Sequence, residues 1–342
     1  MNKMFFQPLK KGTPHFSEKE VKSFLNEKYL IEGLVSVLPS YYDQNFLIEN
    51  DSECFVVKIA NNSRPITMIN FENKVMRSLF KDKFPVQESI ISKSGSEILK
   101  IRNNHNEEFL FRVFKYISGK TLSSIEEISD ELLEDLGRKI AVLENMLTKF
   151  SSEIPVINSY WDLKNAKENL IWENYLPDKG IKDIVTKIVS EFDSLISKLA
   201  YDLQEGVIHG DLNLANLLVN NNSDIELKAV IDFGEVKLSY KIFDLAIACM
   251  YVGLKKEDPL SKFAKVIKGY NSVNRLSDAD IKILFPAICT RICVSTIIAY
   301  KSSSESPENE YIKAKCIPNI ELLQKVNQIR PDIAELYFKA NL

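Results

Sequence analysis

Residues 207–236 read VIHGDLNLANLLVNNNSDIELKAVIDFGEV, and this stretch decides how the rest of the chain is interpreted. Asp211 lies five positions before Asn216, and Asp232 opens the triplet Asp-Phe-Gly further along. A carboxylate can accept a proton from a hydroxyl group, while an amide oxygen and a second carboxylate are hard ligands that suit Mg²⁺. The ordered spacing therefore predicts a phosphoryl-transfer site, with Asp211 as the base and Asn216 and Asp232 as metal ligands.

A β-hairpin is expected inside this stretch. The apolar runs 217–219 and 227–231 are short, and the turn-rich residues 220–224 separate them. A hairpin would bring Asn216 beside Asp232. The alternative is that the Asp-Leu-Asn residues before the hairpin only form a turn and that Asp232 is only an acid at the end of a strand. It requires HGD, the offset Asn216 and the following DFG to coincide by chance.

HGDLNLAN followed by VIDFGEV resembles the aminoglycoside phosphotransferase and choline kinase superfamily, in which HGD replaces the HRD of protein kinases. The similarity to the hydroxylysine kinase branch is closer, and it extends to WDLKN at 161–165, to Arg291 and Tyr300, and to residues 307–309. It covers about residues 30–311. The resemblance implies an α+β, protein-kinase-like fold of two lobes, Mg²⁺ as cofactor, and ATP or GTP bound in the cleft between the lobes.

Length and patterning agree with two lobes, because 342 residues exceed what one core usually fills. Short apolar runs predict an antiparallel meander before Tyr116, and helical periodicity dominates after it. We expect an N-terminal nucleotide-binding lobe at 1–115, with a leading helix capped by Ser17 and Glu20, and a helical lobe at 116–342 that carries the catalytic loop and the substrate site. Strands are expected at 46–48, 55–59, 90–91, 98–101 and 109–114, and helices at 65–80, 125–150, 165–174, 182–203 and 241–254.

The charge balance limits which kinds of partner are expected, and the start of the sequence indicates the expected compartment. Lys and Arg number 44 against 47 Asp and Glu, so we expect no nucleic-acid surface. No signal peptide is expected, which favours the cytoplasm. Five cysteines without a CxxC pair indicate free thiols. The apolar run 283–300 contains Pro286 and Arg291, and it is therefore interpreted as a buried helix and not as a membrane span.

A second pair of residues is expected to hold the nucleotide phosphates. Glu72 falls on the same face of the helix 65–80 as Ile69, Met76 and Leu79, and a carboxylate on an apolar face needs a partner. Lys58, in the strand 55–59, is the natural candidate, because a strand lysine paired with a helix glutamate orients phosphates in kinases. The alternative is a surface lysine and a solvated glutamate.

The nucleotide is expected to meet two further segments. Residues 40–46 occupy the place of a phosphate-covering loop but contain no glycine, and the resemblance implies that Ser40 and backbone amides near Gln44 and Asn45 approach the triphosphate. Backbone groups of the hinge 114–117 are expected to bond a purine, with Phe114 or Tyr116 packed nearby. The sequence SGKT at 118–121 is not a P-loop, because position 114 is not glycine.

Two residues are expected to support the catalytic loop, and four to face the acceptor. The resemblance implies that Asp244 accepts hydrogen bonds from the backbone of residues 209–211 and that His209 packs in the loop. Asp162 or Glu235 is expected to bind an amine and Arg291 a carboxylate, with ion pairs inside the protein as the alternative. Trp161 completes the predicted acceptor residues.

The predicted function is transfer of the γ-phosphoryl group of ATP or GTP to a small-molecule hydroxylated amine. Hydroxylysine is the first choice, followed by choline, ethanolamine, homoserine and an aminoglycoside. Neither a nucleic acid nor a membrane is expected as a partner. A protein kinase is disfavoured because no activation-loop and APE-like segment follows Asp232. A catalytically silent nucleotide-binding protein of the same fold remains as the other alternative.

Overall fold

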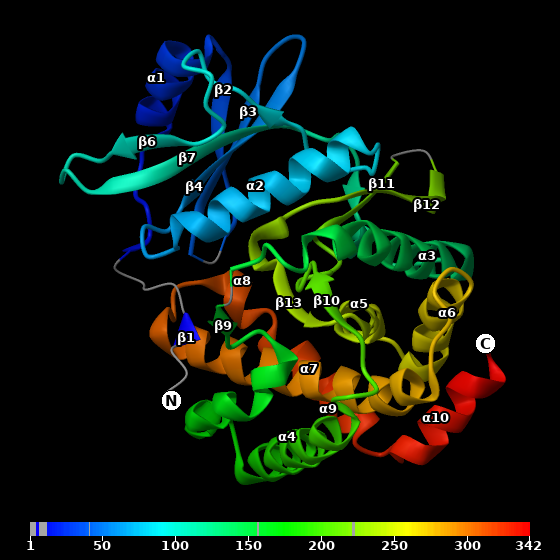
Figure 1. The fold of residues 1–342 in the computed structure, drawn as a ribbon. Coiled ribbons are helices and arrows are strands. Elements are labelled where there is room, and N and C mark those ends of the chain that lie inside the picture. The colour runs from blue at the N-terminus through cyan, green and yellow to red at the C-terminus, as the bar shows by residue number, and fades with distance from the viewer. Residues whose placement is uncertain (1–4, 7–11, 41, 156, 221–222) are drawn as a thin grey trace. The chain divides into compact units, whose positions relative to one another are not determined.

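A computed structural model describes residues 5–6, 12–40, 42–155, 157–220 and 223–342, and the chain in it divides into two compact units (Figure 1). The sheet unit comprises residues 7–118 and 229–234, and the helical unit comprises residues 1–6, 119–228 and 235–342. The predicted α+β class, an antiparallel-sheet part and a larger, mainly helical part, is confirmed. The sheet unit is not one continuous segment, because residues 229–234, which include Asp232, return to it.

The sheet unit is built on an antiparallel sheet with the strand order β2-β3-β4-β7-β5, and β6 pairs with β7. Its strands are β2 (Leu34–Leu38), β3 (Gln44–Glu49), β4 (Cys54–Ala60), β5 (Ser89–Ile90), β6 (Leu99–Arg102) and β7 (Glu108–Lys115). Its helices are α1 (Glu18–Tyr29) and α2 (Ile66–Lys81). The expected meander with one inserted helix is therefore present, and β2 adds a strand that the sequence did not indicate.

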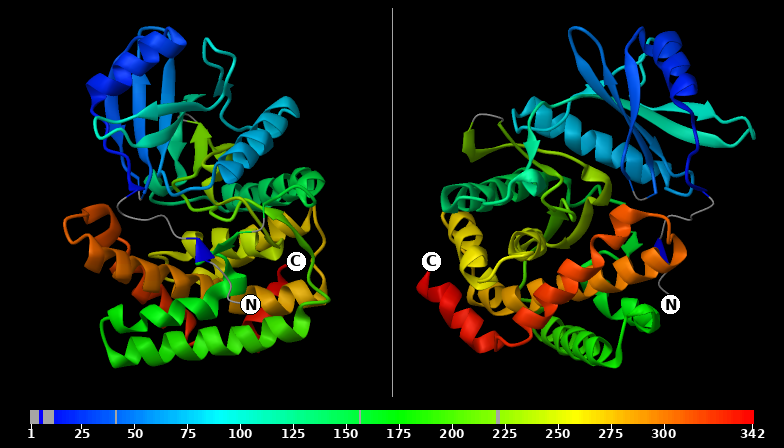
Figure 2. Two further views of the ribbon diagram at one scale, coloured as in Figure 1. Left: turned by 60° about the vertical axis from the view of Figure 1, so that its left-hand side comes forward. Right: turned by 180° about the vertical axis from the view of Figure 1, so that it is seen from behind.

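Helix α1 begins where the sequence predicts. Ser17 and Glu20 form the expected capping box, in which each side chain bonds the backbone N–H of the other residue. Val21 and Leu25 of α1 are buried in one core with Phe46 and Phe111 of the sheet. Figure 2 shows α1 lying along the strands. Two charged residues described below, Lys58 and Glu72, belong to β4 and α2.

The helical unit contains most of the helices, and its longest helix, α7, contacts α4, α5, α9 and α10. Its helices are α3 (Asp130–Leu147), α4 (Lys179–Leu199), α5 (Ile242–Gly253), α6 (Pro259–Asn271), α7 (Asp278–Glu305), α8 (Glu310–Lys313), α9 (Cys316–Val326) and α10 (Pro331–Ala340). The helix expected at 165–174 is a kinked 3₁₀ segment, η4 (Leu163–Tyr175). Short strands in this unit include β8 (Lys120–Thr121), β9 (Asn158–Ser159), β10 (Glu205–Ile208) and β13 (Lys237–Tyr240).

The predicted hairpin is present. Strands β11 (Leu217–Asn220) and β12 (Ser223–Val230) are neighbours in a sheet that also contains β8. Asn216 immediately precedes β11, and Asp232 follows β12. Strands β10 and β13 pair antiparallel on either side of this hairpin in the sequence, a pairing that the sequence did not predict.

Helix α7 contains the apolar run that was expected to be a buried helix. Among the described residues, α7 is long and apolar enough to cross a membrane by length and composition, but 89% of its most apolar window is buried inside the protein. That burial confirms the interpretation as a core helix. The five cysteines are free thiols, as expected, and burial raises the pKa of Cys249 and Cys289.

Candidate active site

The segment after β10 is fixed by a buried carboxylate. Asp244 of α5 has no solvent exposure, and it accepts hydrogen bonds from the backbone N–H of His209 at 2.7 Å and of Gly210 at 2.8 Å. These are the contacts that the sequence led us to expect. Burial raises the pKa of the Asp244 carboxyl group, and His209 and the two N–H donors oppose that rise. Gly210 has φ +78°, and a Cβ there would lie 2.4 Å from the Glu235 carbonyl oxygen, so glycine is required.

Asp211 and Asn216 lie together. Asn216 donates through Nδ2 to the Asp211 carbonyl oxygen at 2.9 Å and to Asp211 Oδ2 at 3.1 Å. Asn213 Nδ2 donates to the same carboxylate oxygen at 2.8 Å. Because the amide nitrogen of Asn216 faces Asp211, the oxygen Oδ1 is the atom that this side chain presents to a cation.

Arg291 of α7 holds the other oxygen of Asp211. Its Nη2 lies 3.2 Å from Asp211 Oδ1, its Nη1 donates to the Trp161 carbonyl oxygen at 3.2 Å, and the guanidinium carbon lies 4.8 Å from the Trp161 ring centroid. Arg291 is 1% exposed. The alternative considered from the sequence, an ion pair inside the protein, thus describes Arg291 in this structure. Arg291 was expected to bind a carboxylate of the acceptor. In this structure its positive charge pairs with Asp211, the predicted base.

Asp162 has partners inside the protein at one of its carboxylate oxygens. Asp162 is 7% exposed, caps η4 by accepting from Lys164 N at 3.1 Å, and accepts from Ser239 Oγ at 2.7 Å. Its carboxylate therefore stabilises a helix start and a strand. Glu235 is more open, with 37% of its side chain exposed, and it pairs with Lys237 Nζ at 2.9 Å.

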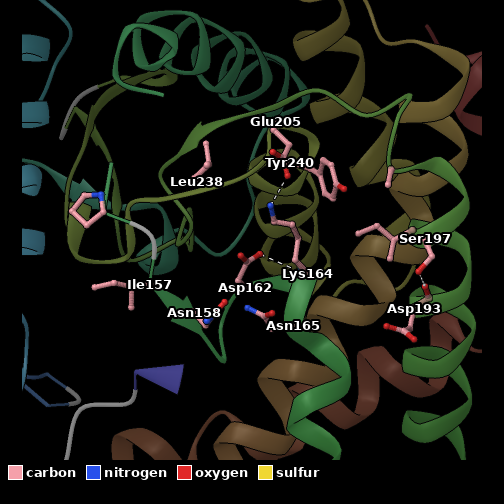
Figure 3. Close-up of a pocket in the computed structure, with 13 residues that line it drawn as sticks. Ile157, Asn158, Asp162, Lys164, Asn165, Asp193, Ser197, Glu205, Leu238 and Tyr240 are labelled. Atoms are coloured by element: carbon pink, nitrogen blue, oxygen red, sulfur yellow. Dashed lines mark hydrogen bonds and ion pairs between the residues drawn. The ribbon is translucent and has the colours of Figure 1, made fainter. Parts of the chain in front are cut away.

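Asp162 also lines a pocket of about 500 Å³ (Figure 3). The pocket lies at the Glu205–Tyr240 end of the β10–β13 ladder, whereas Asp211 follows the other end, at Ile208. Lys164 in its wall pairs with Glu205 at 2.6 Å and lies 5.0 Å from the Tyr240 ring centroid. Asp162 thus has a structural role through Oδ1 and also lines this pocket, and its contact with an acceptor stays a prediction.

Lys315 is a neighbour of Asp211 that sequence reasoning missed. It lies at the start of α9, and burial lowers its pKa to about 8, with the Asp211 charge opposing that shift and the Arg291 charge adding to it. The carboxylate of Asp211 thus has two cationic neighbours. No signal near 315 in the sequence points to this role, because only the packing of α9 on α7 brings the two segments together.

In the sheet unit, the predicted pair of Lys58 with Glu72 is not formed. Lys58 Nζ lies 2.7 Å from Asp232 Oδ1, and Glu72 is bound by Arg112 at 3.1 Å and by Arg64 at 3.3 Å. Glu72 is 1% exposed, and a carboxylate buried to that degree needs donors on both oxygens, which two guanidinium groups supply. Burial alone would raise the pKa of Glu72, but Arg112, Arg64 and Lys58 together outweigh it and lower the pKa.

Arg64 connects more segments than the sequence suggested. It contacts Asp43 Oδ2 at 3.1 Å and the Gly234 carbonyl oxygen at 3.0 Å in addition to Glu72. From the sequence alone, an arginine in the polar stretch before a helix is expected to be solvated. Its three acceptors, on Asp43, Glu72 and Gly234, are evident only in the folded structure. It was therefore missed, as was Arg112, which stands in the middle of a strand.

Part of the expected phosphate-covering loop, residues 40–46, belongs to strand β3 of the sheet. The Ser40 hydroxyl donates to the Asp43 carbonyl oxygen, and Gln44 bonds the backbone of Phe16 through both ends of its amide, at 2.8 and 2.9 Å. Asn45 pairs with Lys58 on one side and Leu38 on the other. The backbone of Gln44 and Asn45 therefore belongs to the sheet, and phosphate contact by this segment stays a prediction. Tyr41 lies outside the described residues.

Part of the expected hinge, residues 114–117, also belongs to the sheet, because β7 ends at Lys115. Phe114 is 1% exposed and lies under Arg112, with 5.4 Å between the guanidinium carbon and the ring centroid, whereas Tyr116 is 38% exposed. Tyr116 donates its backbone N–H to the Cys54 carbonyl oxygen at 2.9 Å. The Ile117 N–H has no acceptor among the described residues, so it is the better candidate for a bond to a purine.

The donor set fits a magnesium ion that is held mainly by its nucleotide. Among the described residues, no group of three His, Cys, Asp or Glu side chains could enclose a metal. Mg²⁺ in nucleotide sites keeps waters and phosphate oxygens and takes only one or two protein oxygens, and an amide oxygen or a carboxylate is a suitable donor. Asn216 belongs to the helical unit and Asp232 to the sheet unit.

The chain resembles known phosphotransferases along most of its length. The model of the phosphotransferase enzyme family matches residues 35–264, more than half of the chain. Hydroxylysine kinase of Bos taurus is 26% identical over 95% of this chain and 93% of that protein, and hydroxylysine kinase of Mus musculus is 26% identical over 87% and 86%.

Solved structures with similar folds are also small-molecule kinases. Amicoumacin kinase hAmiN, in complex with AMP-PNP, Ca²⁺ and Ami, has a TM-score of 0.70 at 19% identity and covers 92% of this chain and 94% of that chain. A microcompartment-associated aminopropanol kinase has a TM-score of 0.68 at 17% identity, with 92% and 99% covered. These similarities confirm the kinase-like fold, and the curated relatives confirm the resemblance stated from the sequence.

Proposed function

Because the chain belongs to the phosphotransferase enzyme family, we propose that it transfers the γ-phosphoryl group of ATP or GTP to the hydroxyl of a hydroxylated amino acid, with hydroxylysine as the first candidate. That the protein is a small-molecule kinase follows from its family and relatives. The observation that carries the proposal is the setting of Asp211. Its carboxylate is oriented by Asn213 and Asn216 on one oxygen and by Arg291 on the other.

The residues divide the reaction between them. Asp211 would orient the acceptor hydroxyl and receive its proton as the hydroxyl oxygen forms a bond to the γ-phosphorus, while the bond from that phosphorus to the β,γ-bridging oxygen breaks. Asn216 and Asp232 would hold Mg²⁺, which neutralises charge on the triphosphate when bound. Lys58, already directed at Asp232, would contact the phosphates. Positioning and charge therefore supply most of the catalysis.

Two cations beside one carboxylate favour an acceptor that carries its own negative charge. Arg291 and Lys315 both lie near Asp211. A substrate carboxylate could accept charge-assisted hydrogen bonds from such cations, and choline and ethanolamine lack that group. Trp161, stacked on Arg291, and the half-exposed Glu235 are proposed to contact the rest of the acceptor, with Glu235 as the partner for an amine.

A panel of acceptors tests the proposal. Purified protein with Mg²⁺ and either ATP or GTP should phosphorylate 5-hydroxylysine with a higher kcat/KM than choline, ethanolamine, homoserine or an aminoglycoside, with the product identified by mass spectrometry. Nucleotide binding that depends on Mg²⁺ without transfer to any acceptor would instead support a catalytically silent protein, and transfer to protein in an extract would support a protein kinase.

The pH dependence of acceptor binding should report Lys315. Its lowered pKa, about 8, means that the ammonium form predominates below that pH and is lost above it. The KM for hydroxylysine should therefore rise about 10-fold as the pH increases from 7 to 9, because one charge-assisted hydrogen bond to the carboxylate disappears. In Lys315→Met the KM should already be high at pH 7, and its remaining change with pH should reflect only the amino groups of the substrate. Identical pH profiles in both proteins would contradict this role.

A further inference from the structure

The sheet unit contains a network of six charged side chains around the buried Glu72. It consists of three cations and three carboxylates, Lys58, Arg64, Arg112, Asp43, Glu72 and Asp232. Glu72 and Arg112 are almost fully buried, and charges withdrawn from water to that degree are tolerated only when they have partners. Arg112 binds one oxygen of Glu72 and Arg64 binds the other, but Arg64 also has partners outside Glu72.

Arg64 joins three segments that are separate in the sequence. Nη1 reaches Asp43 ahead of β3 at 3.1 Å, and Nη2 reaches Glu72 of α2 at 3.3 Å and the Gly234 carbonyl oxygen at 3.0 Å. Only 10% of its side chain is exposed. A guanidinium group offers donors in fixed directions in one plane, whereas a lysine ammonium at the same place cannot bond three acceptors in these directions.

The third contact lies in the turn that carries the proposed metal ligand. Asp232 has φ +64°, a left-handed conformation that a non-glycine residue seldom adopts. Such a conformation persists only where the surroundings enforce it. Lys58 binds Asp232 Oδ1 at 2.7 Å, and Arg64 binds the carbonyl oxygen two residues later, so the turn is held on both sides of Phe233. Phe233 itself is fully buried.

We propose that Arg64 is a positioning residue for phosphoryl transfer, which fixes the Asp232–Gly234 turn to α2 and to the segment before β3. This inference rests on the proposed role of Asp232 as a metal ligand. Arg64 acts through the turn and not by contact with the nucleotide. It also links the segment assigned to phosphate contact, through Asp43, with the segment assigned to the metal. Loosening Arg64 therefore weakens binding of the metal–nucleotide complex.

The experiment compares Arg64→Lys with Arg112→Lys, a matched control. Both substitutions keep the charge and remove a guanidinium that binds Glu72, but Arg112 touches neither Asp43 nor Gly234, and its other side-chain hydrogen bond is to Asn73. Calorimetry with Mg·ADP should give a Kd about 10- to 50-fold weaker for Arg64→Lys and within about 3-fold of wild type for Arg112→Lys. Thermal unfolding without nucleotide should show Arg112→Lys to be at least as destabilised as Arg64→Lys.

Equal losses of Mg·ADP affinity in the two variants would overturn the proposal, because Arg64 would then act only by neutralising Glu72. An unchanged affinity in Arg64→Lys would also overturn it. Asp232→Asn tests the underlying function separately. If that variant binds Mg·ADP as tightly as wild type, Asp232 is not a metal ligand and both ideas fall. If it loses affinity while Arg64→Lys does not, the positioning role alone is refuted.

Discussion

Asp211→Asn is expected to lower kcat for the preferred acceptor by about 10³-fold, while the Kd for Mg·ADP stays within a factor of two or three. The amide keeps the shape of the side chain and its contact with Asn213, but it cannot take the proton of the acceptor hydroxyl. Steady-state kinetics with hydroxylysine, combined with calorimetry for the nucleotide, measures both quantities.

A control is needed because Arg291, which is almost fully buried, loses its anionic partner in this variant. Asn213→Ala removes a different contact to the same carboxylate without removing the base, and we expect it to cost no more than about 10-fold in kcat. Circular dichroism and the unfolding midpoint establish that both variants are folded. Turnover of Asp211→Asn at the wild-type rate would exclude Asp211 as the base.

Local spacing predicted much of the fold and the core of the site. The capping box at Ser17 and the hairpin after Asn216 are set by residues close together in the sequence. The contacts of Asp244 with the backbone at His209, 35 residues away, were instead implied by the family resemblance. The contact between Asp211 and Asn216 lies within one short segment, whereas the expected approach of Asn216 to Asp232 stays a prediction.

Partner choice among distant charges was not predictable in the same way. Lys58 and Glu72 were both identified as residues that need partners, but the sequence gives no rank among Arg64, Arg112 and Asp232 as those partners. Burial decides it, because a fully buried carboxylate takes the two guanidinium groups and leaves the ammonium to a more exposed carboxylate.

The acceptor residues are hard to identify for a related reason. Asp162 was selected for its charge within a motif, yet its position at the start of η4 makes it a helix cap. Lys315 lies outside every motif and reaches Asp211 only because α9 packs on α7. Residues that determine specificity in a family with one reaction and many acceptors are thus the ones that sequence reasoning is least able to find.

Asp244→Asn should combine a loss of stability with a loss of catalysis. The carboxylate accepts from two backbone N–H groups, and an asparagine can accept only one of these bonds and turns an N–H group toward the other. Leaving one buried donor without a partner should lower the free energy of unfolding by about 1–3 kcal/mol. Because those donors belong to the residues just before Asp211, kcat should fall at least about 10-fold, since small displacements of a base are costly.

The dependence of that loss on pH distinguishes this account from simple damage to the core. The pKa of Asp244 in the folded protein is raised above its ordinary value of 3.8, so the folded chain binds this proton more tightly than the unfolded chain. Wild type therefore gains stability from this group as the pH falls through the raised pKa, and that gain is lost as the pH rises. Asparagine does not titrate, and the gap in unfolding free energy between wild type and Asp244→Asn should widen toward acid pH. Urea unfolding at a series of pH values from 3.8 upward measures it, with Phe243→Leu, a core change in the neighbouring residue, as the control whose cost should not vary with pH in this way. A gap that does not change with pH would contradict the raised pKa that burial gives to the Asp244 carboxyl group.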